Sequence, residues 1–389
     1  MRFYLINRMT CTRVKLFGED LKKLFISNGW KESSFSDADY LLINSCSFLK
    51  SREDYFIREI EKMVKDRKSN QKIVVFGCLP STNPKRILAL NNNIVLFSRN
   101  LEGLISYFGF KNKNFSLSTI TNADLTFTQK IISWLNNIFL NDPNITLRLM
   151  KKNVFHVRIS SGCMGNCSYC SERFTTVFKS RKIIEVVDSF AEGLHKGFKV
   201  FAINSDDSSC FGLDNRENIV QLLSKLVSFE GDYKIAVTEF NPQGLFIKNI
   251  LNHLSSKKIC YITIPVQSGS QKILNKMRRP YKINSVIEKV LEIKKINPIL
   301  KINTHLIVGF PGESETDFMK TLFIVKSGLF DRIKVFKYSD RPNTDASKFH
   351  NKVSEGVKRR RAKILQRAII LDAIKKRDFV NFLLNLKQI

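Results

Sequence analysis

Strands and amphipathic helices alternate along two separate stretches of this chain, and this alternation restricts the possible folds more than any other feature of the sequence. In the first stretch, up to about residue 110, strand-like apolar runs lie at 3–7, 40–44, 72–76 and 94–98. The segments between them carry apolar residues at spacings of three and four, which is the pattern of an amphipathic helix. Such alternation predicts a parallel sheet covered by helices.

The second stretch begins at residue 154 and contains six further strand candidates. They are 154–160, 199–205, 234–240, 259–266, 301–310 and 332–339. Helical patterns separate them. Six strands with helical crossovers predict a partial α/β barrel, because a complete eight-stranded barrel usually takes about 250 residues. After residue 350 the pattern is helical and basic.

These patterns divide the chain into four segments. Its length of 389 residues suits two domains and a short appendage. We expect an N-terminal α/β domain at 1–112, a polar, Asn-rich linker at 113–149, a partial barrel at 150–349 and a basic helical extension at 350–389.

Composition indicates where the protein works and what it meets. No apolar run reaches the roughly 18–20 residues that span a bilayer, and the N-terminus has no hydrophobic signal core, so we expect a cytoplasmic protein without membrane association. The 64 Lys and Arg against 35 Asp and Glu give a net charge of +29. This charge favours a polyanionic partner such as RNA, but it also fits a general preference for lysine. Eight cysteines in a reducing compartment are expected to be ligands or catalytic groups.

Three of the cysteines form a compact cluster. Cys163, Cys167 and Cys170 occur as SGCMGNCSYC, directly after the first strand of the second stretch. Thiolates suit zinc and iron–sulfur clusters, but structural zinc normally takes four ligands. Three ligands on a four-iron cluster leave one iron open for a substrate or cofactor. We therefore interpret this loop as catalytic, with Tyr169 shielding the edge of the cluster.

This spacing resembles that of the radical S-adenosylmethionine (SAM) superfamily. The resemblance implies that Cys163, Cys167 and Cys170 hold a [4Fe–4S] cluster whose open iron chelates SAM. An electron from the cluster would then cleave SAM to a 5′-deoxyadenosyl radical. The resemblance also implies an electron donor such as flavodoxin or ferredoxin.

The remaining cysteines are dispersed. Cys11, Cys46 and Cys78 each follow a predicted strand, and loops after successive strands of a parallel sheet converge on one edge. Their three thiolates can therefore hold a second cluster with an open iron, although three scattered buried cysteines would show the same spacing. We expect Cys210 and Cys260 to be structural.

Several longer stretches resemble the methylthiotransferase family, whose members modify tRNA adenosines or a ribosomal protein. They are ADYLLINSCSF, VVFGC, PVQSGSQKILNKMRR, HLIVGFPGESETDF and KYSDRPNTDAS, and the resemblance covers about residues 1–370. It implies an α/β fold with an N-terminal flavodoxin-like parallel sheet, which carries a second [4Fe–4S] cluster on Cys11, Cys46 and Cys78, and a radical SAM partial (βα)6 barrel. The basic helical extension follows in this chain.

The implied reaction consumes two SAM molecules. One methylates sulfur at the second cluster, and the other yields a radical that removes hydrogen from an unactivated C–H bond. The carbon radical then captures the methylthio group. The candidate SAM or substrate contacts are Tyr169, Asp207, Gln267, Ser268, Gly269, Ser270 and Gly309. For Gln267, Ser268 and Ser270 the alternative is an ordinary turn.

The chain departs from the family pattern in three places. The family usually has a proline and then an Arg-Gly pair after the cluster loop. This chain instead reads SERFTTVFKSR at 171–181. Ser205, Asp206 and Asp207 stand where the family usually has Gly-Gln-Asp, which keeps the acid at 207 and adds Asp206. We expect no RNA-binding β-barrel after about residue 370, because that segment shows no alternating strand pattern.

The substrate stays open between tRNA, a peptide or protein, and a small molecule. The RPNT sequence at 341–344 and the positive charge favour a hypermodified tRNA adenosine, whereas the expected lack of a β-barrel favours a peptide or metabolite. His305 is either a substrate contact or a neutral, satisfied histidine. The basic residues that either bind RNA or form a solvated helix face are Lys358, Arg359, Arg360, Arg361, Lys363 and Arg367. Another radical SAM reaction on this scaffold and an RNA-binding module with structural clusters are the remaining alternatives.

Overall fold

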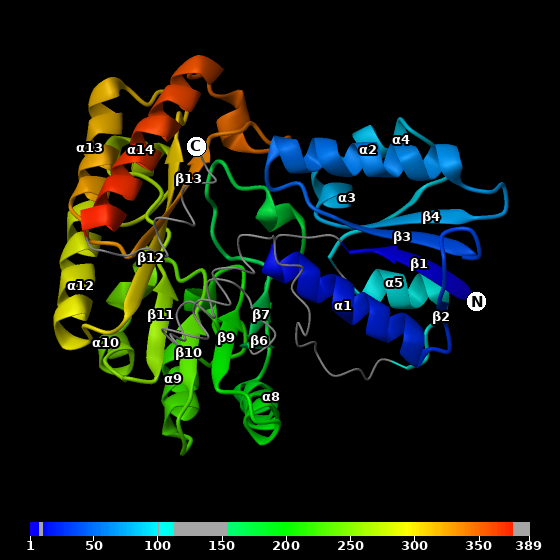
Figure 1. Ribbon diagram of the computed structural model, residues 1–389, viewed down its shortest axis with the longest axis horizontal. Coiled ribbons are helices and arrows are strands. Elements are labelled where there is room, and N and C mark those ends of the chain that lie inside the picture. Colours follow the sequence, from blue (N-terminus) through cyan, green and yellow to red (C-terminus); the bar gives the residue numbers. More distant parts are fainter. Residues whose placement is uncertain (8–10, 100, 113–153, 376–389) are drawn as a thin grey trace.

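The computed structural model describes residues 1–7, 11–99, 101–112 and 154–375. The expected linker at 113–149 and the end of the expected C-terminal extension, from 376 on, lie outside these residues. Among the described helices, none is long and apolar enough to cross a membrane. Figure 1 shows two groups of elements side by side, which we call the N-terminal unit (β1 to α5) and the barrel unit (β6 to α14).

The N-terminal unit is a five-stranded parallel sheet with helices on both faces (Figure 1). The strand order is β2-β1-β3-β4-β5. The strands are β1 (Arg2–Ile6), β2 (Lys31–Glu32), β3 (Tyr40–Ser45), β4 (Lys72–Gly77) and β5 (Val95–Phe97). The helices are α1 (Thr12–Ser27), α2 (Lys50–Asp66), α3 (Leu79–Thr82), α4 (Pro84–Leu88) and α5 (Leu101–Phe108).

Strand β3 shows why this sequence makes a sheet that is covered twice. Leu41 and Ile43 are fully buried in the core that contains Phe56 of α2, whereas Leu42 lies in the core that contains Phe17 of α1. Successive side chains point to opposite faces of a strand, so a continuous apolar run serves both cores. Burial of each such side chain contributes about 1.5–3 kcal/mol to folding.

The barrel unit has six parallel strands in the order β13-β12-β11-β10-β9-β6, so its sheet is open between β6 and β13. This arrangement confirms the predicted partial barrel and α/β fold class. The strands are β6 (Val154–Arg158), β9 (Val200–Asn204), β10 (Lys234–Val237), β11 (Ile259–Thr263), β12 (Lys301–Val308) and β13 (Arg332–Lys337). The α-helices are α8 (Ile183–His195), α9 (Ile219–Ser228), α10 (Ile250–Leu254), α11 (Gln271–Lys276), α12 (Ile283–Ile296), α13 (Glu315–Lys326) and α14 (Glu355–Lys375).

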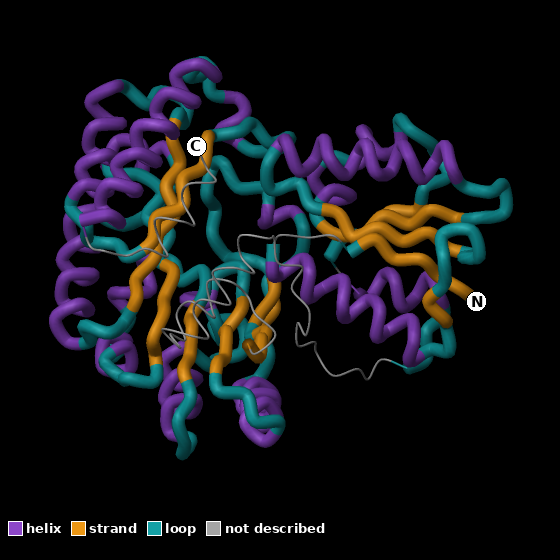
Figure 2. The backbone as a smooth tube through the Cα atoms, in the orientation of Figure 1, coloured by secondary structure: helices purple, strands orange, loops and turns teal. Residues whose placement is uncertain are grey.

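Shorter elements complete the barrel unit. They are the antiparallel pair β7 (Ser160–Ser161) and β8 (Lys179–Ser180), and the 3-10 helices η2 (Glu172–Phe174), η3 (Ser208–Cys210), η4 (Pro242–Phe246) and η5 (Asp345–Lys348). The longer helices lie on the outer side of the curved sheet, and the inner side faces the N-terminal unit (Figure 2).

Strand β12 separates the two sides of this sheet. Ile302, Leu306 and Val308 are buried in the main core with the helices. Asn303 and His305 alternate with them along the strand, so they belong to the opposite face, which lines the barrel interior. The interior face of β12 therefore carries polar side chains at these two positions.

Sequence patterns missed the shortest elements. Strand β2 consists of two charged residues, Lys31–Glu32, and pairs with β1 at the edge of the sheet. The paired strands β7 and β8 are equally short and polar. None of these has an apolar run from which a strand could be predicted.

Candidate active site between the two units

The structure brings the loops of Cys11, Cys46 and Cys78 together at one edge of the N-terminal sheet. Cys46 and Cys78 directly follow the neighbouring strands β3 and β4, and Cys11 immediately precedes α1. The Asn44 side-chain amide donates to the backbone oxygen of Val14 at 2.6 Å, which ties the first two loops together. The Cys78 N–H donates to the Ser45 backbone oxygen at 2.9 Å, which holds the loop of Cys78 against the end of β3, next to Cys46.

The second set of cysteines lies on the loop after β6 and β7. Gly162 begins this loop with a φ of +75°, and a Cβ there would lie 2.7 Å from the backbone of Phe178, so only glycine fits. A Cβ on Gly165 would lie 3.2 Å from the Cys163 sulfur and 3.9 Å from the Cys167 sulfur. The loop thus curls so that these two thiols flank the same point.

Burial keeps most of these thiols protonated in the metal-free protein. It raises the pKa of Cys46 to about 12 and the pKa of Cys163 to about 12. Burial also raises the pKa of Cys78 and of Cys170. Thiolates are the metal-binding form, so assembly of a metal centre here must release protons.

Each cysteine set offers three thiols as possible ligands of an iron–sulfur cluster. Within the described part of the chain, no three His, Cys, Asp or Glu side chains are placed to hold one metal ion. A four-iron cluster spreads its thiolate ligands around a larger body. Three cysteines in each set, with soft sulfur donors, could therefore each hold one iron–sulfur cluster.

The Tyr169 side chain is fixed beside the second cysteine set. Its hydroxyl accepts a hydrogen bond from the Arg279 guanidinium at 2.9 Å, and its ring meets the Phe310 ring edge-on at 6.4 Å. Both partners belong to the barrel unit. The ring therefore has one fixed orientation next to the loop that carries Cys163, Cys167 and Cys170.

The predicted contacts after β11 divide into two groups. Ser268 and Ser270 are fully buried, and their hydroxyls face Thr321 at 3.3 Å and Asp317 at 2.6 Å, both on α13. The Gly269 N–H likewise donates to Thr321 at 3.0 Å, so these three residues fix the loop to the helix.

Gln267 differs from its neighbours. It is buried, its φ is +65°, and its side-chain oxygen lacks a hydrogen-bond partner in the described structure. The side-chain oxygen of Asn303, on the adjacent strand β12, is also buried and lacks a hydrogen-bond partner among the described residues. Unpaired buried acceptors cost free energy unless a ligand satisfies them.

Asp207 and Gly309 also have internal partners. One Asp207 oxygen accepts from the Ser209 N–H at 3.0 Å, and the other accepts from the Asn241 amide at 3.1 Å. The Gly309 N–H donates to the Glu313 carboxylate at 2.6 Å. Both residues therefore stabilise loops at the carboxyl ends of strands.

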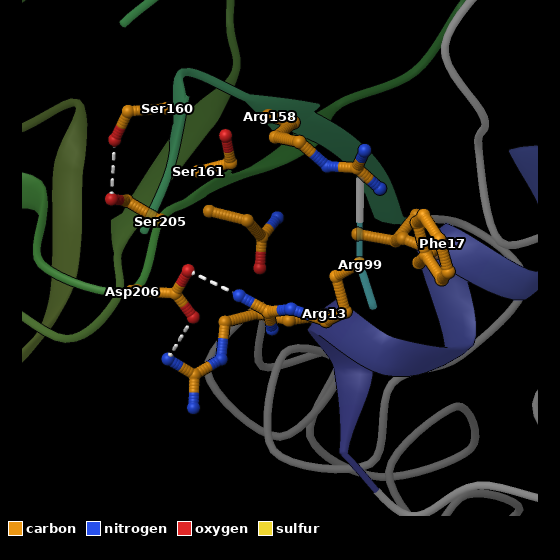
Figure 3. Close-up of a pocket in the computed structure, with 10 residues that line it drawn as sticks. Arg13, Phe17, Arg99, Arg158, Ser160, Ser161, Ser205 and Asp206 are labelled. Carbon is orange, nitrogen blue, oxygen red and sulfur yellow. Dashed lines mark hydrogen bonds and ion pairs between the residues drawn. The ribbon is translucent and has the colours of Figure 1, made fainter. Parts of the chain in front are cut away.

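Asp206, the acid that departs from the family pattern, lies where the two units meet (Figure 3). Its carboxylate is 3% exposed and pairs with Arg13 at 2.7 Å and with Arg99 at 2.6 Å, both from the N-terminal unit. It also accepts a hydrogen bond from the Gly162 N–H at 2.7 Å. Burial alone would raise the Asp206 pKa, but the two guanidinium charges outweigh it and hold the pKa below its ordinary value.

This carboxylate joins the loops of the two cysteine sets. Arg13 lies two residues after Cys11, and Gly162 directly precedes Cys163. The sequence showed Asp206 as a departure but could not show its partners, because Arg13 is 193 residues away along the chain.

The diverged segment 171–181 takes part in the same junction. Its Glu172 lies 3.6 Å from the Arg99 guanidinium, and its Thr175 backbone oxygen accepts from the Arg99 N–H at 3.3 Å. The segment therefore contacts the N-terminal unit. A small cavity of about 40 Å³ beside Asp206 has room for a water molecule or two (Figure 3).

A second junction lies next to Cys46. The buried Arg341 guanidinium, from the RPNT sequence, pairs with Glu53 of α2 at 2.7 Å and donates to the Ser47 backbone oxygen at 3.0 Å. Close by, the Phe48 ring packs edge-on against Phe336 of β13, with centroids 5.4 Å apart. The loop after Cys46 is thus held against the barrel unit.

The remaining cysteines and histidine lie near the interior. Cys260 is buried in β11, and Cys210 belongs to η3. Burial lowers the pKa of His305 to about 4, so the ring is neutral at pH 7. Its Nδ1 lies 3.8 Å from a Glu239 carboxylate oxygen.

Comparison with known proteins identifies the family. Residues 157–325 match the radical SAM superfamily, and residues 4–98 match an uncharacterized protein family, UPF0004. Over 352 residues the chain is 30% identical to the ribosomal protein uS12 methylthiotransferase RimO of Pseudothermotoga lettingae, covering 88% of this chain and 78% of that protein. The chain belongs to the radical SAM methylthiotransferase family.

Another relative of this methylthiotransferase is named for a different substrate, a tRNA adenosine. The chain is 27% identical over 339 residues to the threonylcarbamoyladenosine tRNA methylthiotransferase MtaB of Thermotoga maritima, covering 85% of this chain and 73% of that protein. Among solved structures it resembles the radical SAM methyltransferase TsrM from Kitasatospora setae, with a TM-score of 0.62 at 11% identity, covering 89% of this chain and 77% of that one. That likeness concerns the fold.

The enzyme class and cofactors predicted from the sequence are confirmed: this methylthiotransferase uses SAM and two [4Fe–4S] clusters. When bound, these cofactors supply the radical and the sulfur chemistry. The residues present fit them, because two sets of three soft thiols lie on loops that Asp206 joins, and Gln267 and Asn303 offer unsatisfied acceptors. The protein's own task is to hold the two loops in register and to enclose the interior.

Proposed function

We propose that this methylthiotransferase inserts a methylthio group into a hypermodified adenosine of tRNA. Cys163, Cys167 and Cys170 hold the cluster that binds SAM, and the second cluster lies on the N-terminal set, Cys11, Cys46 and Cys78. Of the other predicted contacts, Tyr169 and Gln267 contact SAM in this proposal, while Asp207, Ser268, Gly269, Ser270 and Gly309 support the loops that carry them. Tyr169 borders the cluster loop, and Gln267 offers an unsatisfied oxygen.

The main observation in favour of an RNA substrate is the distribution of charged residues on α14. The six basic residues that the sequence grouped together do not share one role. Lys358 and Arg361 are buried, and Arg361 pairs with Glu313 at 2.7 Å and Glu315 at 3.1 Å. The prediction that these two contact RNA or solvent is therefore wrong. The sequence showed only their charge, not the acids that they meet.

The outward face of α14 keeps the other charges. Arg359, Lys363 and Arg367 are exposed and recur every four residues, which places them about 6 Å apart along the helix axis. Together with Arg360 they line a shallow hollow. Arg360 pairs with Glu315 at 3.4 Å, whereas no ion pair of Arg359, Lys363 or Arg367 is found among the described residues. A row of three such cations fits the phosphates of a nucleic acid backbone.

Methylthiolation of a ribosomal protein is the second candidate, since the 30% identical relative RimO is named for that activity. One experiment separates the two. Reconstituted enzyme is incubated with SAM, a reductant and either tRNA or ribosomal subunits from a strain that lacks the modification. Mass spectrometry of digested tRNA should show a methylthioadenosine derivative. Modified ribosomal protein with unmodified tRNA would overturn the tRNA proposal.

The outward charges of α14 make a separate prediction. Changing Arg359, Lys363 and Arg367 together to Gln should weaken tRNA binding and reduce the slope of log K against log salt by about 2–3, since each lost phosphate contact removes about 0.7–0.9. Fluorescence anisotropy at several salt concentrations measures both quantities.

A matched control removes the same charge elsewhere. Arg58, Lys62 and Lys65 are exposed on α2, which belongs to the N-terminal unit and not to α14. Their triple change to Gln should leave the salt slope close to that of the unchanged protein. Equal losses in both triple variants would show that net charge, and not the α14 row, binds the RNA.

A further inference from the structure

Four charged side chains meet where the two units touch, and each unit supplies charges of one sign. The acids Asp206 and Glu172 belong to the barrel unit, and the bases Arg13 and Arg99 belong to the N-terminal unit. Arg99 is shared, because its guanidinium lies 2.6 Å from Asp206 and 3.6 Å from Glu172. Two acids and two bases leave no net charge, so the network separates charge between the units instead.

The acids lie beside the cysteines of the barrel unit, which we call the barrel set: Cys163, Cys167 and Cys170. Glu172 lies in η2, two residues after Cys170, and its side chain is 12% exposed. Its Oε2 is buried without a hydrogen-bond partner in the described structure. Asp206 accepts the N–H of Gly162, the residue before Cys163. Water screens these two buried charges poorly, so they act strongly on nearby groups.

The bases lie beside the N-terminal set of cysteines. Arg13 follows Cys11 by two residues. Arg99 follows β5, which pairs with β4, and Cys78 directly follows β4. Because the carboxyl ends of neighbouring parallel strands share one edge of a sheet, Arg99 and Cys78 lie at the same edge. The positive end of the network therefore faces the N-terminal set.

The thiols respond to both signs of charge. Burial, and after it the charge of Glu172, raises the pKa of Cys170 and of Cys78. At Cys78 the charge of Arg99 opposes this rise. A negative charge that disfavours a thiolate also disfavours an added electron on a cluster which that thiolate holds.

Two further charged residues belong to the barrel side. Burial, and after it the charge of Asp207, raises the pKa of Cys163. The cation on this side is Arg279, whose guanidinium donates to the Tyr169 hydroxyl at 2.9 Å. This guanidinium offsets one of the three acids there, so the barrel side of the junction stays the more negative one.

We propose that this separation of charge gives the two clusters different reduction potentials. Glu172 makes the cluster on the barrel set harder to reduce, and Arg13 makes the cluster on the N-terminal set easier to reduce. The step concerned adds one electron from an external one-electron donor to a [4Fe–4S]²⁺ cluster, gives [4Fe–4S]¹⁺ and breaks no bond. A cluster that is hard to reduce is a strong reductant once reduced, which favours the cleavage of SAM. This role rests on the proposed assignment of each cysteine set to one cluster.

The test is a titration with dithionite of protein that holds one cluster at a time, followed by electron paramagnetic resonance. Cys46→Ala leaves the cluster of the barrel set, and Cys167→Ala leaves the other. With Cys46→Ala, the further change Glu172→Gln should raise the ratio of reduced to oxidised cluster about tenfold at a given potential, which is an upward shift of about 59 mV. Glu172→Asp keeps the charge and should stay within about threefold. With Cys167→Ala, Arg13→Gln should lower the ratio about tenfold.

Asp331→Asn is the matched control. The Asp331 side chain is 16% exposed and pairs with Lys294 at 3.3 Å, but it directly precedes β13, at the opposite end of the barrel strands from the cysteine loop. Its change should leave both ratios within about twofold. A ratio that Glu172→Gln leaves unchanged, or that Arg13→Gln raises, would refute the proposal. If either single-cluster protein holds far fewer than about four iron atoms, the assignment of the cysteine sets has failed, and the proposal fails with it.

Discussion

Replacing Cys46 with alanine should reduce methylthio transfer to background while SAM is still cleaved to 5′-deoxyadenosine. Replacing Cys167 with alanine should remove both activities. The reason is that the two residues lie in separate thiol sets, one at the edge of the N-terminal sheet and one on the loop after β6. Chromatography of 5′-deoxyadenosine and S-adenosylhomocysteine, with mass spectrometry of the substrate, measures each step.

Iron content tests the same assignment of the two cysteine sets without a measurement of activity. Anaerobically reconstituted protein should contain about eight iron atoms per chain, and each single variant about four, because a [4Fe–4S] cluster that loses one of three thiolates is poorly held. Cys260→Ala serves as the control, since this thiol is buried within β11 among Val154, Val200 and Ala236, and it should keep about eight. A Cys46→Ala protein with full iron content would contradict the assignment of the second cluster.

Replacing Asp206 with asparagine should loosen the contact between the two units. The change removes the shared acid of two buried ion pairs and leaves the Arg13 and Arg99 guanidiniums facing each other. Loss of one partner from a buried pair typically costs about 3–5 kcal/mol. Hydrogen exchange of the cluster-free protein should show faster exchange of the Gly162 amide, which donates to this carboxylate.

The same variant should uncouple the two halves of the reaction. SAM cleavage depends on the loop of Cys163, whereas transfer also requires the loop of Cys11 in register with it, so more 5′-deoxyadenosine should form for each product molecule. Asp232→Asn is the control, because the Asp232 side chain is 95% exposed and its nearest cation lies at 4.0 Å. If the two variants behave alike, Asp206 does not align the loops.

Local pattern was sufficient to predict the longer strands and helices and their order. All six long strands of the barrel unit lie within the predicted runs, since each alternates or continues in apolar residues that reach a core. The same reasoning placed Cys46 and Cys78 at strand ends, because a strand that ends at one edge of a parallel sheet determines where its loop begins.

Contacts across the chain could not be predicted in this way. Glu53 and Arg341 form a buried pair although 288 residues separate them, and neither has a local pattern that indicates a partner. Lys358 and Arg361 looked like any other charge in a basic helix, yet they are buried. A sequence gives the charge of a side chain, whereas its burial depends on which element packs against it.

The ion pair between Glu53 and Arg341 determines when, during synthesis, the loop after Cys46 can pack against the barrel unit. During synthesis the loop after Cys46 leaves the ribosome long before Arg341 exists, so this contact forms only when nearly the whole chain has been made. Until then the thiol edge of the N-terminal sheet stays open to the surrounding solution. We therefore expect delivery of iron and sulfide to Cys46 to be easiest before β13 packs against Phe48.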